Sequence, residues 1–365
     1  GKDMNDNLKN IIVSLIFIIL IVGMLAVNVL KEDTVVSISE RRKLEQFPEF
    51  TFANLTSGKF FEKFDKYVTD QFIERETFRK TKVLVEKDLF GKKDYNNIYV
   101  KDGVLIEQTY PLNEQSVISL TKKINNIKEK YLTANNKTYY TIVPDKNYFV
   151  NGDNMRLDYE KLKSLMQDGL SWAEYIDIFD DLDLDSYYIT DSHWKQEKLQ
   201  KVVQKIAEKM DMNLSNEYEE KKIIDFKGVY AGQYPIQTSG DTLRILTNKI
   251  LEECTVYNYE KNVQTKIYDM NKLNAYDKYD IFLSGATALL KIENPNATTN
   301  KELIIFRDSY GSSLTPLLVQ NYSTVTVVDT RYISPKILGK YMKFNNQDVL
   351  FEYSVLLINN SSTVQ

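Results

Sequence analysis

The sequence predicts an α/β fold in which parallel core strands are flanked by helices, preceded by one membrane-spanning helix. Two observations lead to this prediction. The C-terminal part alternates short apolar runs with amphipathic stretches, the pattern of strand–helix–strand units in a parallel sheet. Near the N-terminus, residues 11–30 form an uncharged apolar run about as long as a helix needs to cross a bilayer.

The composition is that of a globular protein, gives no indication of nucleic-acid binding and excludes an intramolecular disulfide. The 365 residues suffice for one large domain or two ordinary ones, and 43% of them are hydrophobic. A formal net charge of −4 gives no reason to expect nucleic acid as a partner. Cys254 is the single cysteine, so an intramolecular disulfide is excluded and we expect a buried thiol.

The apolar run at 11–30 is expected to be an uncleaved transmembrane signal anchor. A cleaved signal peptide is the alternative, but its apolar region is usually shorter, and "MLAVNVLKED" offers no convincing pair of small residues for cleavage. Lys2 and Lys9 indicate that residues 1–10 lie in the cytoplasm. The rest of the chain would then be extracytoplasmic, held at the cell membrane by a single span, and the scarcity of cysteine suggests a Gram-positive bacterium.

A tether and a long helix are predicted next. Residues 31–56 form a polar linker and entry segment, and residues 57–365 form one extracytoplasmic domain. Within that domain, aromatic residues at helical spacing over 57–90 predict an amphipathic helix that packs on the main body. Two apolar runs joined by Lys-Asp-Gly predict a hairpin over 96–108.

The core elements follow from the spacing of apolar residues. Steps of three and four predict helices from Val117 to Tyr131 and from Leu199 to Met210. The other predicted elements are strands at 138–144, 175–180, 302–306, 324–329 and 349–358, helices near 312–320 and 335–343, and β-structure over 243–270.

The turn after the strand at 302–306 carries a candidate nucleophile. "RDSYG" (307–311) joins this strand directly to a predicted helix. Sites in open α/β sheets collect at the carboxyl ends of strands, and a serine on such a turn lies beside free helix N–H groups. Ser309 is therefore a candidate nucleophile; the alternative is that Ser309 or Ser312 only caps the helix.

The only histidine of the chain, His193, lies in "ITDSHW" just before a predicted helix. Asp191, two residues earlier, lies on the same side of an extended segment and can orient the imidazole. A serine hydroxyl attacks only when a base with a fixed tautomer takes its proton. Asp191 to orient, His193 to accept the proton and Ser309 to attack make a complete candidate triad. The alternative is a helix N-cap beside a half-buried histidine.

Together these motifs resemble the bacterial DHHW family, which is akin to the SGNH-like proteins that O-acetylate alginate and other exopolysaccharides. The resemblance extends from "SERRKLEQFPEF" to "DVLFEYSVLLINNS" and covers nearly everything after the apolar run. It implies an SGNH-hydrolase-like sheet, with the same three roles for Asp191, His193 and Ser309. It also implies acetyl transfer to or from a secreted polysaccharide, and a multi-pass membrane acyltransferase as the partner that supplies acetyl groups. No cofactor is expected.

The sequence departs from the family pattern at several points. Ser192 stands at the second position of the motif in place of His, and Arg307 stands where SGNH enzymes carry Gly. The Asp–His pair also precedes the serine, and no Gly-x-Asn-Asp block is visible. We therefore expect the oxyanion hole at the backbone N–H groups of Ser309 and Gly285.

Five further residues are candidates for substrate binding. Arg331 can meet a carbohydrate hydroxyl or an acidic sugar group, although an exposed structural arginine is the alternative. The rings of Tyr310, Trp194 and Tyr332 suit sugar stacking, while core packing is the default expectation for each. Lys146, in "VPDKN", is the fifth candidate.

Three other functions remain open at this point. A polysaccharide acetyl esterase would use the same triad with water as the acceptor. A non-catalytic sugar-binding scaffold would leave the triad unused. A metal-dependent phosphoesterase would need the acidic residues of 177–193 as ligands with His193. Those carboxylates do not repeat at a liganding interval, so we expect no metal.

Overall fold

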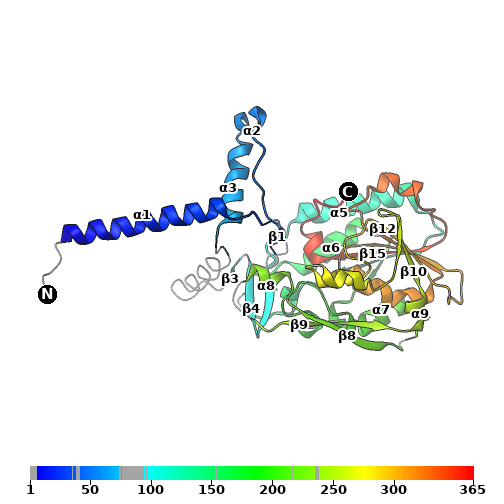
Figure 1. The fold of residues 1–365 in the computed structure, drawn as a ribbon. Coiled ribbons are helices and arrows are strands. Elements are labelled where there is room, and N and C mark those ends of the chain that lie inside the picture. Colours follow the sequence, from blue (N-terminus) through cyan, green and yellow to red (C-terminus); the bar gives the residue numbers. More distant parts are fainter. Residues whose placement is uncertain are drawn as a thin grey trace. The chain divides into compact units, whose positions relative to one another are not determined.

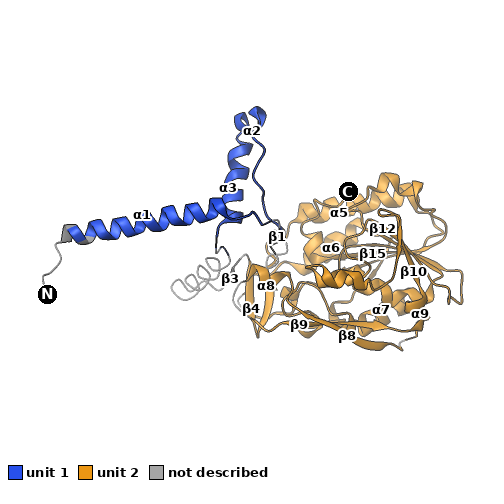
Figure 2. Cartoon of the chain, in the orientation of Figure 1, with its two compact units in different colours: residues 1–93 blue, residues 94–365 orange. Residues whose placement is uncertain are grey.

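The structure of the chain is a computed structural model. It describes residues 6–34, 36–37, 42–73, 75, 94–95, 97–152, 154–215, 217–234 and 238–365. The chain divides into two compact units, residues 1–93 and 94–365 (Figure 2). Each unit is described by itself.

The first unit begins with the long apolar helix that the sequence predicts. Helix α1 spans Asp6–Leu30, and its segment Asn10–Leu30 is long and apolar enough to cross a membrane (Figure 1). None of this segment is buried against other parts of the protein. A signal anchor and a signal peptide both fit such a helix.

The rest of the first unit is small and aromatic. Its further elements are β1 (Val36–Ser37), β2 (Arg42–Lys43), α2 (Phe52–Thr56) and α3 (Lys59–Gln71). On α3, Phe60, Phe64 and Tyr67 contact the ring of Phe47 edge-on. The helix predicted over 57–90 is thus present as α3, whereas residues 76–93, including Phe78, lie outside the described residues.

The second unit is built on an eight-stranded sheet. In spatial order its strands are β11 (Val263–Thr265), β10 (Thr255–Asn258), β12 (Leu289–Glu293), β14 (Thr324–Val328), β13 (Glu302–Arg307), β15 (Asp348–Ser354), β6 (Thr138–Val143) and β7 (Glu174–Ile176). From β14 to β7 all neighbours run parallel, whereas β11, β10 and β12 pair antiparallel at the other edge. The predicted parallel core is confirmed.

Both faces of this sheet are covered. The helices and 3₁₀ turns of the unit include α5 (Glu114–Tyr131), α6 (Tyr159–Gly169), α7 (Gln200–Lys209), α9 (Lys249–Glu253), η7 (Thr315–Asn321) and η8 (Pro335–Lys340). Successive side chains of a strand point to opposite faces. Accordingly, Leu303 and Ile305 of β13 belong to a core with α7 and η7, and Ile304 and Phe306 to a core with α5 and α6. A strand buried on both faces explains the unbroken apolar run of β13.

Two smaller β-structures complete the unit. The predicted hairpin is confirmed as β4 (Ile98–Lys101) and β5 (Val104–Glu107), with β3 (Asp94–Tyr95) beside β4. Its two turn residues, Asp102 and Gly103, have φ of 51° and 79°, as a two-residue type I′ turn requires. A separate ribbon pairs β8 (Glu219–Phe226) with β9 (Asp241–Thr247).

Some predicted elements end elsewhere, for local reasons. The strand predicted over 349–358 stops at Ser354, because the Ser354 hydroxyl accepts a hydrogen bond from the Leu357 N–H and caps α11 (Val355–Ile358). The alternation in "TKIYDM" (265–270) is not a strand beyond Thr265. The segment from Thr315 to Asn321 is a 3₁₀ helix that starts with a proline in its first turn.

The character of α1 generates a prediction about the membrane. The full chain expressed in bacterial cells should stay with membranes through a high-salt wash, and mass spectrometry should still detect peptides from its first 30 residues. Ile18→Arg, near the centre of the span, should weaken membrane association, because a central arginine costs about 3 kcal/mol.

The matched control is Val29→Arg, where a charge near the helix end can reach the interface at lower cost. A protein found free in the medium with an N-terminus beyond residue 26 would contradict the anchor and indicate a signal peptide.

Candidate active site

The candidate nucleophile lies at the carboxyl end of the central strand. Strand β13 ends at Arg307, and Asp308, Ser309 and Tyr310 turn the chain into α10 (Gly311–Leu314). Because β14, β15 and β6 run parallel to β13, their following loops gather at the same edge of the sheet. Ser309 is half-buried at this edge.

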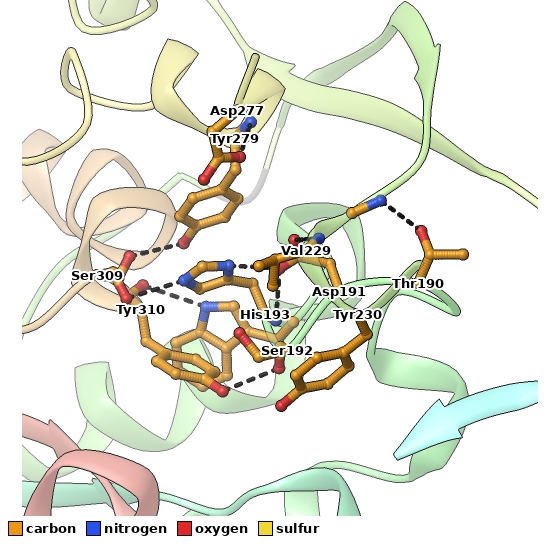
Figure 3. A network of polar contacts seen from close by, with 12 residues as sticks. Thr190, Asp191, Ser192, His193, Val229, Tyr230, Asp277, Tyr279, Ser309 and Tyr310 are labelled. Carbon is orange, nitrogen blue, oxygen red and sulfur yellow. Dashed lines mark hydrogen bonds and ion pairs between the residues drawn. The ribbon is translucent and has the colours of Figure 1, made fainter. Parts of the chain in front are cut away.

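The Asp–His pair lies on a tight loop that reaches the same edge. Tyr187 and Trp194 form an isolated antiparallel bridge, and the Tyr188 N–H donates to the His193 carbonyl at 3.1 Å. These bonds close a short loop that presents Asp191 and His193 toward the turn at Ser309 (Figure 3).

The structure brings the three predicted triad residues together in order. The Nδ1 atom of His193 lies 2.6 Å from an Asp191 carboxylate oxygen, and its Nε2 atom lies 2.8 Å from Ser309 Oγ (Figure 3). Asp191 is 1% exposed and His193 9%. With Nδ1–H donating to the carboxylate, Nε2 is free to accept the serine proton, which is the tautomer that a general base needs.

The electrostatics of the pair favour a strong base. Burial alone would raise the pKa of Asp191, but the adjacent His193 and backbone hydrogen bonds, including one from the Val229 N–H, lower it below its usual value. Burial alone would lower the pKa of His193, but the Asp191 carboxylate, and more weakly Asp277 and Asp308, raise it above 6.5.

Several groups behind the loop hold Asp191 in place. The Asp241 carboxylate accepts hydrogen bonds from the Ile189 and Thr190 N–H groups and from the Thr190 hydroxyl, at 2.6 to 2.8 Å. Gly228 lies so close to Asp191 that a Cβ there would be 2.4 Å from the Asp191 Cβ. A side chain at position 228 would therefore displace the orienting carboxylate.

A buried cluster of Arg307, Asp308 and Glu352 holds the turn that carries Ser309. The Asp308 carboxylate accepts the N–H groups of Tyr310, at 3.0 Å, and Ser354, at 2.7 Å. Beside it, burial and then the Asp308 charge raise the pKa of Glu352 well above its usual value. Arg307, 1% exposed, donates to Ser312 and Thr287 at 2.9 Å. The arginine found in place of the family's glycine is therefore part of the scaffold of the turn.

The backbone around Ser309 bears on the expected oxyanion hole. In the described part of the chain, the Ser309 N–H has no protein acceptor within hydrogen-bond distance, so it is free for a developing oxyanion. The Gly285 N–H instead donates to the Phe282 carbonyl at 3.1 Å. Ser309 is thus the free amide at the nucleophile, and Gly285 would have to release its bond to serve as the second donor.

Most of the other predicted residues face the protein interior. Trp194 is fully buried, and its indole N–H donates to Ser313 Oγ at 2.9 Å. Tyr310 is 3% exposed, and its hydroxyl donates to the Ser192 carbonyl at 2.9 Å. Neither ring has a free face for a sugar, because core packing uses both.

Lys146 also lies behind the triad. Its ammonium group donates to the carbonyls of Leu105, Ile189 and Asp191 at 2.6 to 3.4 Å, and burial lowers its pKa to about 7. It therefore ties the β4–β5 hairpin to the Asp191 loop and does not face a substrate.

Arg331 and Tyr332 are different, because they follow β14 at the site edge of the sheet. The Arg331 guanidinium makes a bidentate ion pair with Asp329, at 3.0 and 2.7 Å, and lies over the Tyr332 ring. Tyr332 is 49% exposed, so of the predicted aromatic residues it alone presents a ring to solvent.

The acidic stretch that could have held a metal is used for structure. Four of its carboxylates cap a turn or pair with lysines: Asp177 with Lys163, Asp181 with Lys205, Asp183 with the Ser186 N–H, and Asp185 with Lys198. Across the described residues, no group of three or more His, Cys, Asp or Glu side chains is placed to hold a metal ion.

Three further residues that shape the site were not predicted from the sequence. Tyr279 stacks on His193, Asp241 holds the Thr190 backbone, and Gly228 leaves room for Asp191. Gly228 in "FKGVY" was the only one with a visible signal, since an isolated glycine marks a close backbone approach. The other two reach the site through tertiary folding alone.

Comparisons with known proteins bear on this site. The family model described as "DHHW protein" matches residues 177–328. A DHHW family protein from Eubacterium siraeum has a similar structure, with a TM-score of 0.58 and 17% identity over 73% of this chain and 92% of that chain. No protein with a curated description matches the sequence.

PatB1 of Bacillus cereus is similar as well, with a TM-score of 0.58 and 16% identity over 72% of this chain and 96% of that chain. The structure of PatB1 with a sulfonyl adduct has a TM-score of 0.56. More distantly, the O-acetyltransferase domain of Pseudomonas putida AlgJ has 11% identity and a TM-score of 0.46 over 72% of this chain and 92% of that chain.

At these identities the likenesses show the fold alone, and the predicted α/β architecture with a parallel core is confirmed. The family match covers the segment that holds Asp191, His193 and Ser309. Residues 177–328 are thus similar to the DHHW family.

Proposed function

We propose that this protein is an O-acetyltransferase that modifies hydroxyl groups of a secreted polysaccharide through an acetyl-enzyme on Ser309. The observation that carries the proposal is the connected row of Asp191, His193 and Ser309, with contacts of 2.6 and 2.8 Å. Residues so far apart in the sequence meet at the edge of the sheet with the hydrogen bonds that nucleophilic acyl transfer requires.

The reaction follows from these contacts. His193 Nε2 takes the proton of Ser309 Oγ while the oxygen attacks the acetyl carbonyl, and the Ser309 N–H lies at hand for the oxyanion. The intermediate collapses as the donor oxygen leaves with the proton from His193. A sugar hydroxyl then gives its proton to His193 and takes the acetyl group, and Ser309 recovers its proton. No electrons are exchanged, so the residues present suffice for both half-reactions.

The surroundings of the triad support a polar polymer as acceptor. The Tyr332 ring is exposed beside the Arg331 ion pair, which suits stacking on one sugar and hydrogen bonding to another. Helix α1 is consistent with a protein that acts at the outer surface of the cell membrane. Acetyl groups made in the cytoplasm would then need a multi-pass membrane acyltransferase to deliver them.

An acetyl esterase is the second candidate, because the same triad hydrolyses an acetyl-enzyme when water replaces the sugar. The observation that favours this candidate is the partial exposure of Ser309, because water can reach an exposed acetyl-enzyme. A sugar-binding scaffold is less well supported, since a scaffold has no need of a base, an orienting carboxylate and a free amide at one serine.

The triad assignment predicts the effect of two substitutions. The full chain in detergent should slowly hydrolyse an aryl acetate and gain an acetyl mass on Ser309. Ser309→Ala and His193→Ala should each lower turnover at least about a thousandfold. Ser323→Ala, whose hydroxyl bonds the Lys301 carbonyl at the other end of the sheet, is the control and should keep full activity. Full turnover by Ser309→Ala would refute the assignment.

The raised pKa of His193 predicts the pH dependence. The base works only when neutral, so kcat/KM for a neutral ester should fall as the pH drops through the pKa of His193. The charges of Asp191, Asp277 and Asp308 all raise the pKa of His193, so the acid limb should have its midpoint above pH 6.5. A midpoint at or below 6.5 would contradict the buried ion pair.

A third experiment separates transferase from esterase. The chain is given an acetyl donor and oligosaccharides of several exopolysaccharide types, and mass spectrometry follows acetyl on the sugars. A transferase should acetylate the matching oligosaccharide and consume donor faster in its presence, since a bound acceptor outcompetes water. Asp191→Ala should lose both effects.

The converse assay offers acetylated oligosaccharide in water. Rapid loss of acetyl without transfer to any acceptor would replace the transferase with an esterase. Binding of the oligosaccharide without either reaction would favour the scaffold.

A further inference from the structure

The catalytic imidazole lies against the ring of Tyr279. The ring centroids of His193 and Tyr279 are 3.8 Å apart, with only 7° between the planes (Figure 3). Tyr279 is 2% exposed, so the stack is shielded from water. Tyr310 lies on His193 as well, at 4.9 Å and tilted by 54°.

The hydroxyl of Tyr279 reaches the nucleophile turn. It donates to the Ser309 carbonyl at 2.8 Å and lies 2.9 Å from Ser313 Oγ. Ser313 Oγ in turn accepts the indole N–H of Trp194 at 2.9 Å. Because Trp194 directly follows His193 in the chain, these contacts link His193, Trp194, Ser313 and Tyr279 in a closed loop. The Tyr279 hydroxyl also connects this loop to the backbone of Ser309.

The backbone that carries Tyr279 is held in an unusual conformation. Tyr279 belongs to η6 (Lys278–Ile281), and Leu283, Ser284 and Gly285 follow it with φ of 51°, 63° and 79°. Such a run costs free energy for the two residues with a Cβ. The Leu283 N–H bond to Ile267, at 2.9 Å, helps to hold it. Strain of this kind collects where a side chain must be placed accurately.

We propose that Tyr279 is the positioning residue of the triad: its ring favours the protonated form of His193, and its hydroxyl fixes the turn that carries Ser309. This inference rests on the proposed function, because it concerns the step in which His193 takes the serine proton.

The physical basis is the charge distribution of the aromatic ring. The face of a phenol ring is negative, so it attracts a cation more than a neutral ring. When His193 accepts the proton of Ser309 it becomes an imidazolium, and the stack strengthens at that moment. Catalysis gains from interactions that are stronger in the transition state than in the ground state.

The test uses the fact that His193 is the only histidine. In the full chain labelled with ¹³C-histidine and purified in detergent, one imidazole NMR signal reports its pKa without any enzymatic assay. Tyr279→Leu removes the stack and should lower the pKa of His193 by about half a unit to one unit. Asp191, Asp277, Asp308 and Tyr310 also face the imidazole and stay unchanged in this variant.

A matched control and a second variant isolate the two parts of the proposal. Tyr268→Leu removes another tyrosine that packs on Phe282, as Tyr279 does, and should leave the pKa of His193 unchanged. Tyr279→Phe keeps the stack and the pKa but loses the bond to the Ser309 carbonyl, so acetylation of Ser309 by an aryl acetate should slow twofold to tenfold.

An unchanged pKa of His193 in folded Tyr279→Leu protein, or an equal shift in Tyr268→Leu, would overturn the inference. If the leucine variant does not fold, full acetylation rates in Tyr279→Phe would overturn it. A wild-type chain that transfers no acetyl group, yet shows the pKa difference, would refute the transferase and support the stacking.

Discussion

The hydrogen bond between the buried carboxylate of Asp191 and the imidazole of His193 is the contact on which the site depends. Both groups lie out of water, where an unpaired charge would be costly, so each depends on the other. Asp241 fixes the backbone before the carboxylate, and Gly228 leaves space for it. Asp241 and Gly228 thus keep the Asp191 carboxylate in position beside His193. Because that carboxylate accepts the Nδ1–H of His193, Nε2 is left free to act as the base.

The sheet supplies the other half of the site. A doubly buried β13 is rigid because cores pack against both of its faces, and it delivers Ser309 to the edge where parallel strands end. The Asp308 carboxylate accepts the N–H of Tyr310, just after the nucleophile, and the N–H of Ser354, the last residue of the neighbouring β15. The distance between base and nucleophile is therefore set by two anchored loops, one on each side of the contact.

The sequence could predict what depends on local pattern. Apolar spacing identified the parallel core, and the Asp-x-His and strand–turn–helix motifs identified three residues that meet in space. Burial of individual side chains has no local signal, which is why the sequence left both sugar stacking and core packing open for Trp194 and Tyr310. Tyr279 could not be found at all, since it meets His193 only through tertiary folding, 86 residues further along the chain.

In the proposed reaction, a single histidine also limits how the protein can choose between a sugar hydroxyl and water as the acceptor. His193 must be neutral at the start of each half-reaction and charged within each, so both acceptors meet the same base. Its raised pKa helps deprotonation of either one equally. Selectivity for a sugar hydroxyl must therefore arise outside the triad, from groups that hold the acceptor while leaving no room for water. Tyr332 and Arg331, on the loop after β14, are the residues that we propose for such contacts.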